Sequence, residues 1–360
     1  MNFAQINIKM LEMCKFMHFN RMNEARAGFH PKETGRRKIK GMTMKKVAIV
    51  GWSGYSGLEL ARLALRHPQM ELAACFSRNQ ETHLPSLLPG APSVQILSTE
   101  ELSQRADQFD TIFFATPTEA SLELIPHITS STARIIDLSG GFRCKKDVVY
   151  GLQPFCNSKA QFIANPGCYV TSVLMALVPL VKASLIDTTR IVIDAKSGSS
   201  GAGKSLRSDL LFCEVEGNCL PYKVAQHQHL PEILYYMEEF AGLTANVLFT
   251  PHLMPFKRGI ISSIYAQTKG SESDLTQVYS EAYKDYPLVS TQSLSEGSNL
   301  LLLSKVVGTP RTHISFKVVD GELYLFSCID NLLKGAASQA IENWNVQNDL
   351  PPQYGLEVYQ

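Results

Sequence analysis

The stretch KKVAIVGWSGYSGLEL, residues 45–60, decides the fold of this chain. It opens with a short apolar, β-branched run that ends in glycine, which is typical of a buried strand. Apolar residues then recur at helical spacing through residues 57–68, which predicts a helix that ends before a proline. Between the two elements stand Gly51, Gly54 and Gly57, whose backbone N–H groups can approach a pyrophosphate at a helix N-terminus. This strand–turn–helix unit predicts a Rossmann-type dinucleotide site, although a glycine-rich turn without a ligand is the alternative.

The same pattern continues along the first half of the chain. Predicted strands MELAACFSR, FDTIFFATP, ARIIDLSG and AQFIANPG alternate with predicted helices, which indicates βαβ units in a parallel sheet. Beyond residue 185 strand follows strand, with predicted helices around 231–241, 273–285 and 331–345. We therefore expect an α/β protein in which an N-terminal Rossmann-type sheet precedes a second, α+β domain on a largely antiparallel or mixed sheet.

Composition excludes several classes of function. A chain of 360 residues with a net charge of +1 has room for about two domains and lacks the basic excess of a nucleic-acid or membrane-surface protein. No apolar run reaches the roughly 18 residues of a membrane-spanning helix. The eight cysteines form no C-x-x-C pair and no metal-ligand spacing. We expect reduced thiols in a cytoplasmic protein that holds no metal.

The first 43 residues differ from the rest. Their second half is rich in Lys and Arg and has no apolar period, and a secretory h-region is missing. We expect a disordered extension, or translation that begins at Met42 or Met44. A transit peptide is the alternative, which Glu12, Glu24 and Glu33 argue against.

The second predicted strand indicates which nicotinamide cofactor binds. An acid about 20 residues after the glycines usually takes the ribose 2′-hydroxyl of NAD, whereas arginine accommodates the 2′-phosphate of NADP. Here CFSRNQ places Ser77 and Arg78 at that point, which favours NADP(H) unless Arg78 is merely a surface residue. The remaining candidates for cofactor contact are Ser53, Tyr55, Ser56, Thr116, Pro117, Ser199 and Gly201.

The stretch FIANPGCYVTSVLMALVPLV (162–181) supplies the candidate nucleophile. Asn165, Pro166 and Gly167 force a corner after a predicted strand, and the apolar run behind Cys168 predicts a helix. A cysteine at a helix N-terminus is a stabilised thiolate, whereas a packing cysteine needs no such corner. We predict that Cys168 is the catalytic residue.

Two other stretches offer groups for acid–base chemistry and for anions. His227 and His229 stand two residues apart before a predicted helix, with no third metal ligand near them in sequence. The loop AKSGSSGAGKSLRSD (195–209) offers backbone N–H groups, Lys204 and Arg207. It also fits the Walker pattern literally, but the apolar helix that follows a phosphate-binding loop is missing. A substrate loop is therefore the simpler interpretation.

Together these motifs resemble the N-acetyl-γ-glutamyl-phosphate reductase family of the semialdehyde dehydrogenase superfamily. The matching pieces fall in family order over residues 46 to about 343: GWSGYSGLEL, FSR, NPGCYVTSVLMALVP, SGSSGAGK, HQHLPEI, TPHLMPFKRGI and DNLLKGAASQAI. The resemblance implies a Rossmann domain formed by residues 44–165 with 330–360. It also implies a catalytic and dimerisation domain formed by residues 166–329, and a homodimer or homotetramer.

The resemblance further implies the reaction. Cys168 would attack the acyl phosphate of N-acetyl-glutamyl phosphate, and NADPH would reduce the thioacyl enzyme to the semialdehyde. The first histidine of the pair, His227, would be the acid/base, while His229, Lys204, Arg207 and Arg258 are candidates for substrate contact. Related aspartyl or aminoadipyl reductases, or a non-catalytic NADP-binding protein, are the alternatives.

The sequence also departs from the family pattern. LSGGFR stands where the family usually reads LSADFR, so that an aspartate is lost at Gly141. YGLQPFCN loses a glutamate near Pro154. These changes put substrate affinity, or the exact substrate, in doubt.

Overall fold

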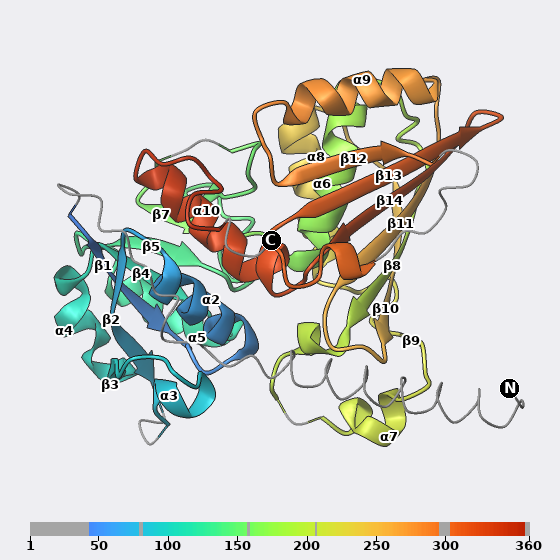
Figure 1. Cartoon of the computed structure of the whole chain (residues 1–360). Helices are drawn as coiled ribbons and strands as arrows, with labels where there is room; N and C mark the ends of the chain where they lie inside the picture. Colours follow the sequence, from blue (N-terminus) through green and yellow to red (C-terminus); the bar gives the residue numbers. More distant parts are fainter. Residues whose placement is uncertain (1–42, 79–81, 157–158, 206, 295–302, 357–360) are drawn as a thin grey trace, which may run out of the picture.

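A computed structural model describes residues 43–78, 82–156, 159–205, 207–294 and 303–356. The described chain forms two seven-stranded sheets, which Figure 1 shows side by side. The predicted N-terminal extension lies outside the described residues except for Thr43. No helix in these ranges is long and apolar enough to cross a membrane.

The first sheet is parallel, as predicted, with the order β3-β2-β1-β4-β5-β7-β6. Its strands are β1 (Lys45–Val50), β2 (Met70–Ser77), β3 (Gln95–Ser98), β4 (Thr111–Phe114), β5 (Arg134–Asp137), β6 (Val149–Tyr150) and β7 (Phe162–Ala164). Its helices are α2 (Tyr55–Arg66), α3 (Leu84–Leu87), α4 (Leu102–Arg105) and α5 (Thr118–Leu124). The chain runs from β1 to β2 on one side and later to β4 on the other. This reversal opens a crevice at the carboxyl ends of β1 and β4, where such sheets bind ligands.

The second sheet is mixed, as predicted, with the order β12-β13-β14-β11-β8-β10-β9. Its strands are β8 (Ile191–Gly198), β9 (Leu220–Pro221), β10 (Val247–Met254), β11 (Ile260–Gln267), β12 (Val289–Ser293), β13 (Thr312–Val319) and β14 (Glu322–Ile329). The helices of this half are α6 (Cys168–Lys182), α7 (Phe212–Val215), α8 (His229–Ala241) and α9 (Glu272–Tyr283). Helix α6 packs on β11 and β14 and is buried over nearly its whole length. It therefore forms the core of this half of the molecule.

The end of the chain returns to the first sheet (Figure 1). After β14 comes one turn of π-helix, Leu333–Ala337, followed by α10 (Ser338–Gln347). Both pack against α2, and Trp344 of α10 is fully buried with its ring edge-on to His67 at 5.0 Å between centroids. A π-turn carries one extra residue per turn and often marks a functional site. Here it lies between the two sheets.

The docked tail gives a stability prediction. Gly355 has φ +73°, and a Cβ there would lie 2.3 Å from Cδ2 of the fully buried His67. We expect Gly355→Ala to lower the free energy of unfolding by about 3 kcal/mol, because backbone strain adds to a clash with a ring that cannot move. Gly217→Ala is the matched control: its φ is +68°, but nothing lies within 4 Å of the added Cβ. Gly217→Ala should lower the free energy of unfolding, measured by urea denaturation, by only about 1 kcal/mol. An equal loss in both variants would contradict the clash with His67.

Candidate active site

A cavity of about 590 Å³ lies between the two sheets and brings most of the predicted site residues together. It is lined from the first half of the chain by the loop after β1 and by residues that follow β4 and β5. From the second half it is lined by Cys168, by the loop after β8, by the start of α8 and by the π-turn. The predicted residues that line it are Gly51, Ser53, Gly54, Tyr55, Ser56, Thr116, Pro117, Cys168, Gly201, Lys204 and His229.

The glycines of the β1–α2 loop are required by its geometry. Gly51 has φ +79°, and a Cβ there would lie 2.7 Å from the carbonyl oxygen of Ala115. A Cβ on Gly57 would lie 2.4 Å from the carbonyl oxygen of Gly51. Gly54 is the N-cap of α2 and provides no capping side chain, so that the N–H groups of the first helical turn are open toward an anion. The loop therefore fits a pyrophosphate group.

Other predicted cofactor residues lie outside the lining of this cavity. Ser199 Oγ donates to the carbonyl oxygen of Phe256 at 3.4 Å. Ser77 is the last residue of β2, and Arg78 follows it. Arg78 is mostly exposed, with Nη2 3.7 Å from a carboxylate oxygen of Glu123. Such an exposed pair contributes little to stability, so the guanidinium is available to another anion.

Cys168 stands at the start of α6, as predicted. Gly167 is the N-cap and has no side chain, so that the helix N-terminus is open toward the cavity. The π-turn closes over the nucleophile from the other side, because a Cβ on Gly335 would lie only 2.7 Å from Cβ of Cys168. This enclosure has an electrostatic cost. Burial raises the pKa of the Cys168 thiol to about 11, although the charge of Arg143 and the N–H of Tyr169 oppose it. Burial therefore opposes the predicted thiolate, and the thiol needs a base.

The structure places His229, rather than His227, in the cavity. Nε2 of His229 faces the corner before the nucleophile, since it would lie 2.5 Å from a Cβ on Gly167. The ring of His227 instead packs edge-on against Tyr169, Tyr222 and Phe249, outside the cavity lining. Its Nδ1 accepts the backbone N–H of His229 at 3.1 Å. His227 therefore supports the segment that carries His229.

Burial is the main cause that keeps both imidazoles neutral. Burial, together with the smaller effect of the Lys223 charge, lowers the pKa of His227 to about 4. Burial, followed by the charge of Arg143, lowers the pKa of His229 well below the usual value. A neutral His229 can accept a proton at neutral pH, which is what a buried thiol requires.

The three cationic side chains predicted to contact substrate lie in different surroundings. Lys204 lines the cavity, and its Nζ donates to the carbonyl oxygen of Ser53 at 2.6 Å and lies 5.3 Å from the centroid of the Tyr55 ring. Arg258 and Arg207 lie outside the lining. Arg258 is held between Glu59 and Asp330, both at 3.0 Å, and Arg207 pairs with its own neighbour Asp209. The predicted substrate contact of Arg258 is therefore not supported, because two buried carboxylates already hold its guanidinium. Arg207 lies in an exposed pair outside the lining, and its substrate contact stays a prediction.

Sequence reasoning missed Arg143, which is buried and lines the cavity. Its Nε donates to the carbonyl oxygen of Asn165 at 2.9 Å, and its Nη2 donates to that of Leu138 at 2.7 Å. The available signal was its place three residues after the fourth predicted strand, ARIIDLSG, in the stretch LSGGFR. In the same loop, Gly141 lies outside the cavity lining, and a Cβ there would lie 3.0 Å from Leu122.

The loop after β8 is no phosphate-binding loop of Walker type. β8 belongs to the second sheet, and one short 3-10 turn follows it in place of a helix. Ser200 of this turn accepts a hydrogen bond from Asn331 Nδ2 at 3.0 Å. The loop is thus tied to the segment that leads into the π-turn, and it forms one wall of the cavity.

Comparison with known proteins places the fold and the site in one class. The model of the semialdehyde dehydrogenase NAD-binding domain matches residues 46–162, and that of the semialdehyde dehydrogenase dimerisation domain matches residues 168–331. The fold is shared with aspartate semialdehyde dehydrogenase II from Vibrio cholerae (TM-score 0.69, 16% identity, 85% of this chain and 99% of that one). It is also shared with aspartate semialdehyde dehydrogenase with NADP from Candida albicans (TM-score 0.66, 14% identity, 85% and 99%). The class is thus that of the semialdehyde dehydrogenases.

Closer relatives define the family within this class. The chain is 37% identical over 347 residues to N-acetyl-gamma-glutamyl-phosphate reductase from Desulfotalea psychrophila, which covers 88% of this chain and 99% of the relative. It is 39% identical over 342 residues to the enzyme of that name from Halalkalibacterium halodurans, with coverages of 87% and 98%. The chain belongs to the N-acetyl-gamma-glutamyl-phosphate reductase family.

Proposed function

We propose that this chain reduces N-acetyl-glutamyl 5-phosphate to N-acetylglutamate 5-semialdehyde with NADPH, releases phosphate, and so acts in arginine biosynthesis. The observation that carries the proposal is the meeting of three features in one cavity. These are the glycine-rich loop after β1, Cys168 at the start of α6 and the neutral His229 at the start of α8. The names of the curated relatives supply the substrate.

The residues of the first half fit a dinucleotide. The open N–H groups of α2 and the glycines that admit no Cβ would hold the pyrophosphate, and Thr116 and Pro117 line the path toward Cys168. When bound, the nicotinamide supplies a hydride to the carbon atom attached to the cysteine sulfur.

The chain's own residues carry the remaining steps. His229 accepts the proton of the Cys168 thiol, and the sulfur attacks the acyl carbon of the substrate. Phosphate leaves as the C–O bond to it breaks, and a thioester remains. The N–H groups at the start of α6 stabilise the negative oxygen. After reduction the C–S bond breaks, the aldehyde leaves, and His229 returns the proton to the sulfur.

The test runs the reaction in reverse. Phosphate-dependent reduction of NADP is measured with N-acetylglutamate semialdehyde and with aspartate semialdehyde. We expect turnover with the first substrate and little with the second. A preference for aspartate semialdehyde would indicate an aspartate-type reductase of the superfamily. No turnover with either substrate would indicate a non-catalytic protein.

Arg78 gives the prediction on cofactor choice. We expect Arg78→Ala to raise KM for NADP by one to two powers of ten, because a charged hydrogen bond to the 2′-phosphate of about 1.5–3 kcal/mol is lost. KM for NAD should not change. Glu123→Gln, which removes only the exposed partner of Arg78, is the control and should not weaken NADP binding. Equal use of NAD and NADP by the unaltered protein would contradict the proposal.

The second sheet supports the proposed homodimer or homotetramer. Its inner face packs on α6, α8 and α9, while its outer face carries a row of neighbouring side chains across four strands. Three of them, Leu248, Tyr265 and Tyr324, are exposed. We propose that a second copy of the chain covers this row. We also propose that the two domains divide at the predicted boundaries and that the protein works in the cytoplasm. Light scattering of the purified protein measures the assembly.

A further inference from the structure

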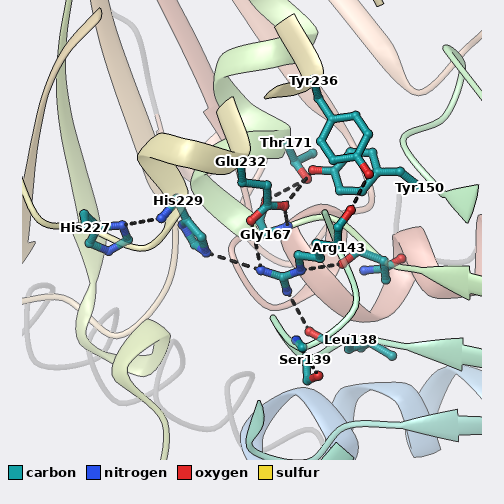
Figure 2. A network of polar contacts seen from close by, with 12 residues as sticks. Leu138, Ser139, Arg143, Tyr150, Gly167, Thr171, His227, His229, Glu232 and Tyr236 are labelled. Atoms are coloured by element: carbon teal, nitrogen blue, oxygen red, sulfur yellow. Dashed lines mark hydrogen bonds and ion pairs between the residues drawn. The ribbon is translucent and has the colours of Figure 1, made fainter. Parts of the chain in front are cut away.

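The starts of α6 and α8 meet at the catalytic corner. Cys168 is the first residue of α6, and His229 is the first residue of α8. Glu232 lies three residues after His229, so that both side chains leave the same face of α8. Figure 2 shows Glu232 between this helix and the Gly167 peptide, with Arg143 below it.

Glu232 joins three segments of the chain through a buried carboxylate. Its Oε1 accepts the backbone N–H of Gly167 at 2.9 Å and the hydroxyl of Tyr150 at 2.7 Å. Its Oε2 accepts from Nη1 of Arg143 at 3.2 Å. The side chain of Glu232 is only 5% exposed and that of Arg143 10%, so the two charges need each other. A carboxylate whose two oxygens are both satisfied in this way fixes its partners in place.

Arg143 carries the connection on to His229. Two of its nitrogens are held by the carbonyl oxygens that follow β5 and β7, as described above. The third, Nη1, faces both Glu232 and Nε2 of His229, the latter at 3.5 Å. A guanidinium can only donate, so this contact assigns the lone pair to Nε2. The proton of the neutral ring is then on Nδ1, which has no hydrogen-bond partner among the described residues. The lone pair therefore lies on the nitrogen that faces the Gly167 corner.

We propose that Glu232 is a positioning residue of the active site, which holds the Gly167 peptide and Arg143 together and thereby sets Cys168 against His229. The proposal rests on the proposed roles of Cys168 and His229. It assigns Arg143 to the internal support of the site, since its donors are already directed at protein acceptors. It also explains how the starts of α6 and α8, which are 61 positions apart along the chain, are held in a fixed relative position. Glu232 in the first turn of α8 accepts the N–H of Gly167, the N-cap of α6.

The charge of Glu232 provides a readout that a purely structural role would not move. The positive charge of Arg143 lowers the pKa of the Cys168 thiol, whereas the negative charge of Glu232 raises it. Removal of the carboxylate charge should therefore make the thiol easier to ionise while it makes the site less active. The titratable or charged groups that act on Cys168 are Arg143, Tyr169, Tyr222 and Glu232, and His229 faces the adjoining Gly167.

The experiment compares Glu232→Gln with the unaltered protein. Alkylation of Cys168 by iodoacetamide is followed against pH by mass spectrometry, without substrate or cofactor. We expect the midpoint of the alkylation profile to fall by about one pH unit. In the same variant kcat should fall by about 100-fold, the usual result of a misplacement of about 1 Å, while KM for NADP stays unchanged.

Glu59→Gln is the matched control, because Glu59 is also a buried carboxylate paired with an arginine, Arg258, and both residues lie outside the cavity lining. It should leave the alkylation midpoint where it is. Glu232→Asp retains the charge but shortens the reach, so its kcat should fall while its alkylation midpoint stays. An unaltered kcat in either Glu232 variant would overturn the proposal, as would an alkylation midpoint that stays fixed in Glu232→Gln. If Glu232→Gln does not fold, the kcat and the alkylation midpoint of Glu232→Asp decide whether the proposal holds. Alkylation needs no substrate, so it tests the role of Glu232 even if the substrate of the proposed reaction is wrong. An error in the proposed reaction would appear instead as missing turnover in the unaltered protein.

Discussion

Replacement of Cys168 by serine is expected to lower turnover by more than about 10³-fold. A serine hydroxyl in this corner is a far weaker nucleophile than sulfur, and an oxygen ester would not be reduced as a thioester is. The fold should be preserved, because the side chain only loses size at the open start of α6. Turnover is measured as phosphate-dependent reduction of NADP, and cofactor affinity is measured by titration of NADPH fluorescence. The affinity should stay within about a factor of two of that of the unaltered protein, because the loop after β1 is unchanged.

Cys213→Ser serves as the control, since Cys213 is exposed on α7 and lies outside the cavity lining. Its turnover should equal that of the unaltered protein. Retained turnover in Cys168→Ser would rule out the thioester route, whereas loss of turnover in both variants would point to damage unrelated to the nucleophile.

His229→Asn is expected to lower kcat by about 10² to 10⁴-fold, which is the usual contribution of a general acid–base. It should also slow alkylation of Cys168 near neutral pH, because the thiol loses its base. The unaltered protein should show no loss of kcat/KM as pH falls from about 7 to 6, where an ordinary histidine titrates. Burial and the charge of Arg143 place the pKa of His229 well below that range.

His227→Asn tests the exchange of roles between the two histidines. The amide can still accept the backbone N–H of His229, which Nδ1 of His227 accepts at 3.1 Å. We expect kcat to fall by less than about 10-fold, and the free energy of unfolding to fall by about 2 kcal/mol, because a buried ring packed among three aromatic rings is lost. If His227→Asn has the larger effect on kcat, the role predicted from the sequence is restored.

Much of the site could be predicted because its signals are local. A strand, a glycine turn and a helix in succession indicate the cofactor loop whatever the rest of the chain does. The Pro-Gly corner before an apolar run likewise indicates where α6 begins, and the structure agrees to the residue. The burial of that corner, in contrast, comes from Gly335, which is 167 positions further along the chain. No local pattern indicates it, so the raised pKa of Cys168 was missed.

The histidine pair shows a second limit. An extended segment would place His227 and His229 on one face. Instead Lys223 and Ala225 adopt positive φ angles of 47° and 58°, and α8 begins at His229 itself. The two rings still meet edge-on at 4.8 Å between centroids, but only His229 lines the cavity, whereas His227 packs among aromatic rings. The ion pair of Arg258 could not be predicted for a similar reason, because its partner Glu59 is 199 positions away and no spacing in the sequence links them.

The return of the chain end to the first sheet has a consequence for the order in which the protein matures. On a ribosome the first sheet is made early, but its cover, α10, and the π-turn against Cys168 are made close to the end. Domains that are complete in sequence can fold during synthesis, but the cofactor domain of this chain has to wait for its last part. A nascent chain interrupted before residue 330 lacks both the cover over α2 and one wall of the cavity. We expect a chain that stops before residue 330 to lack reductase activity, because both of these parts of the site are missing.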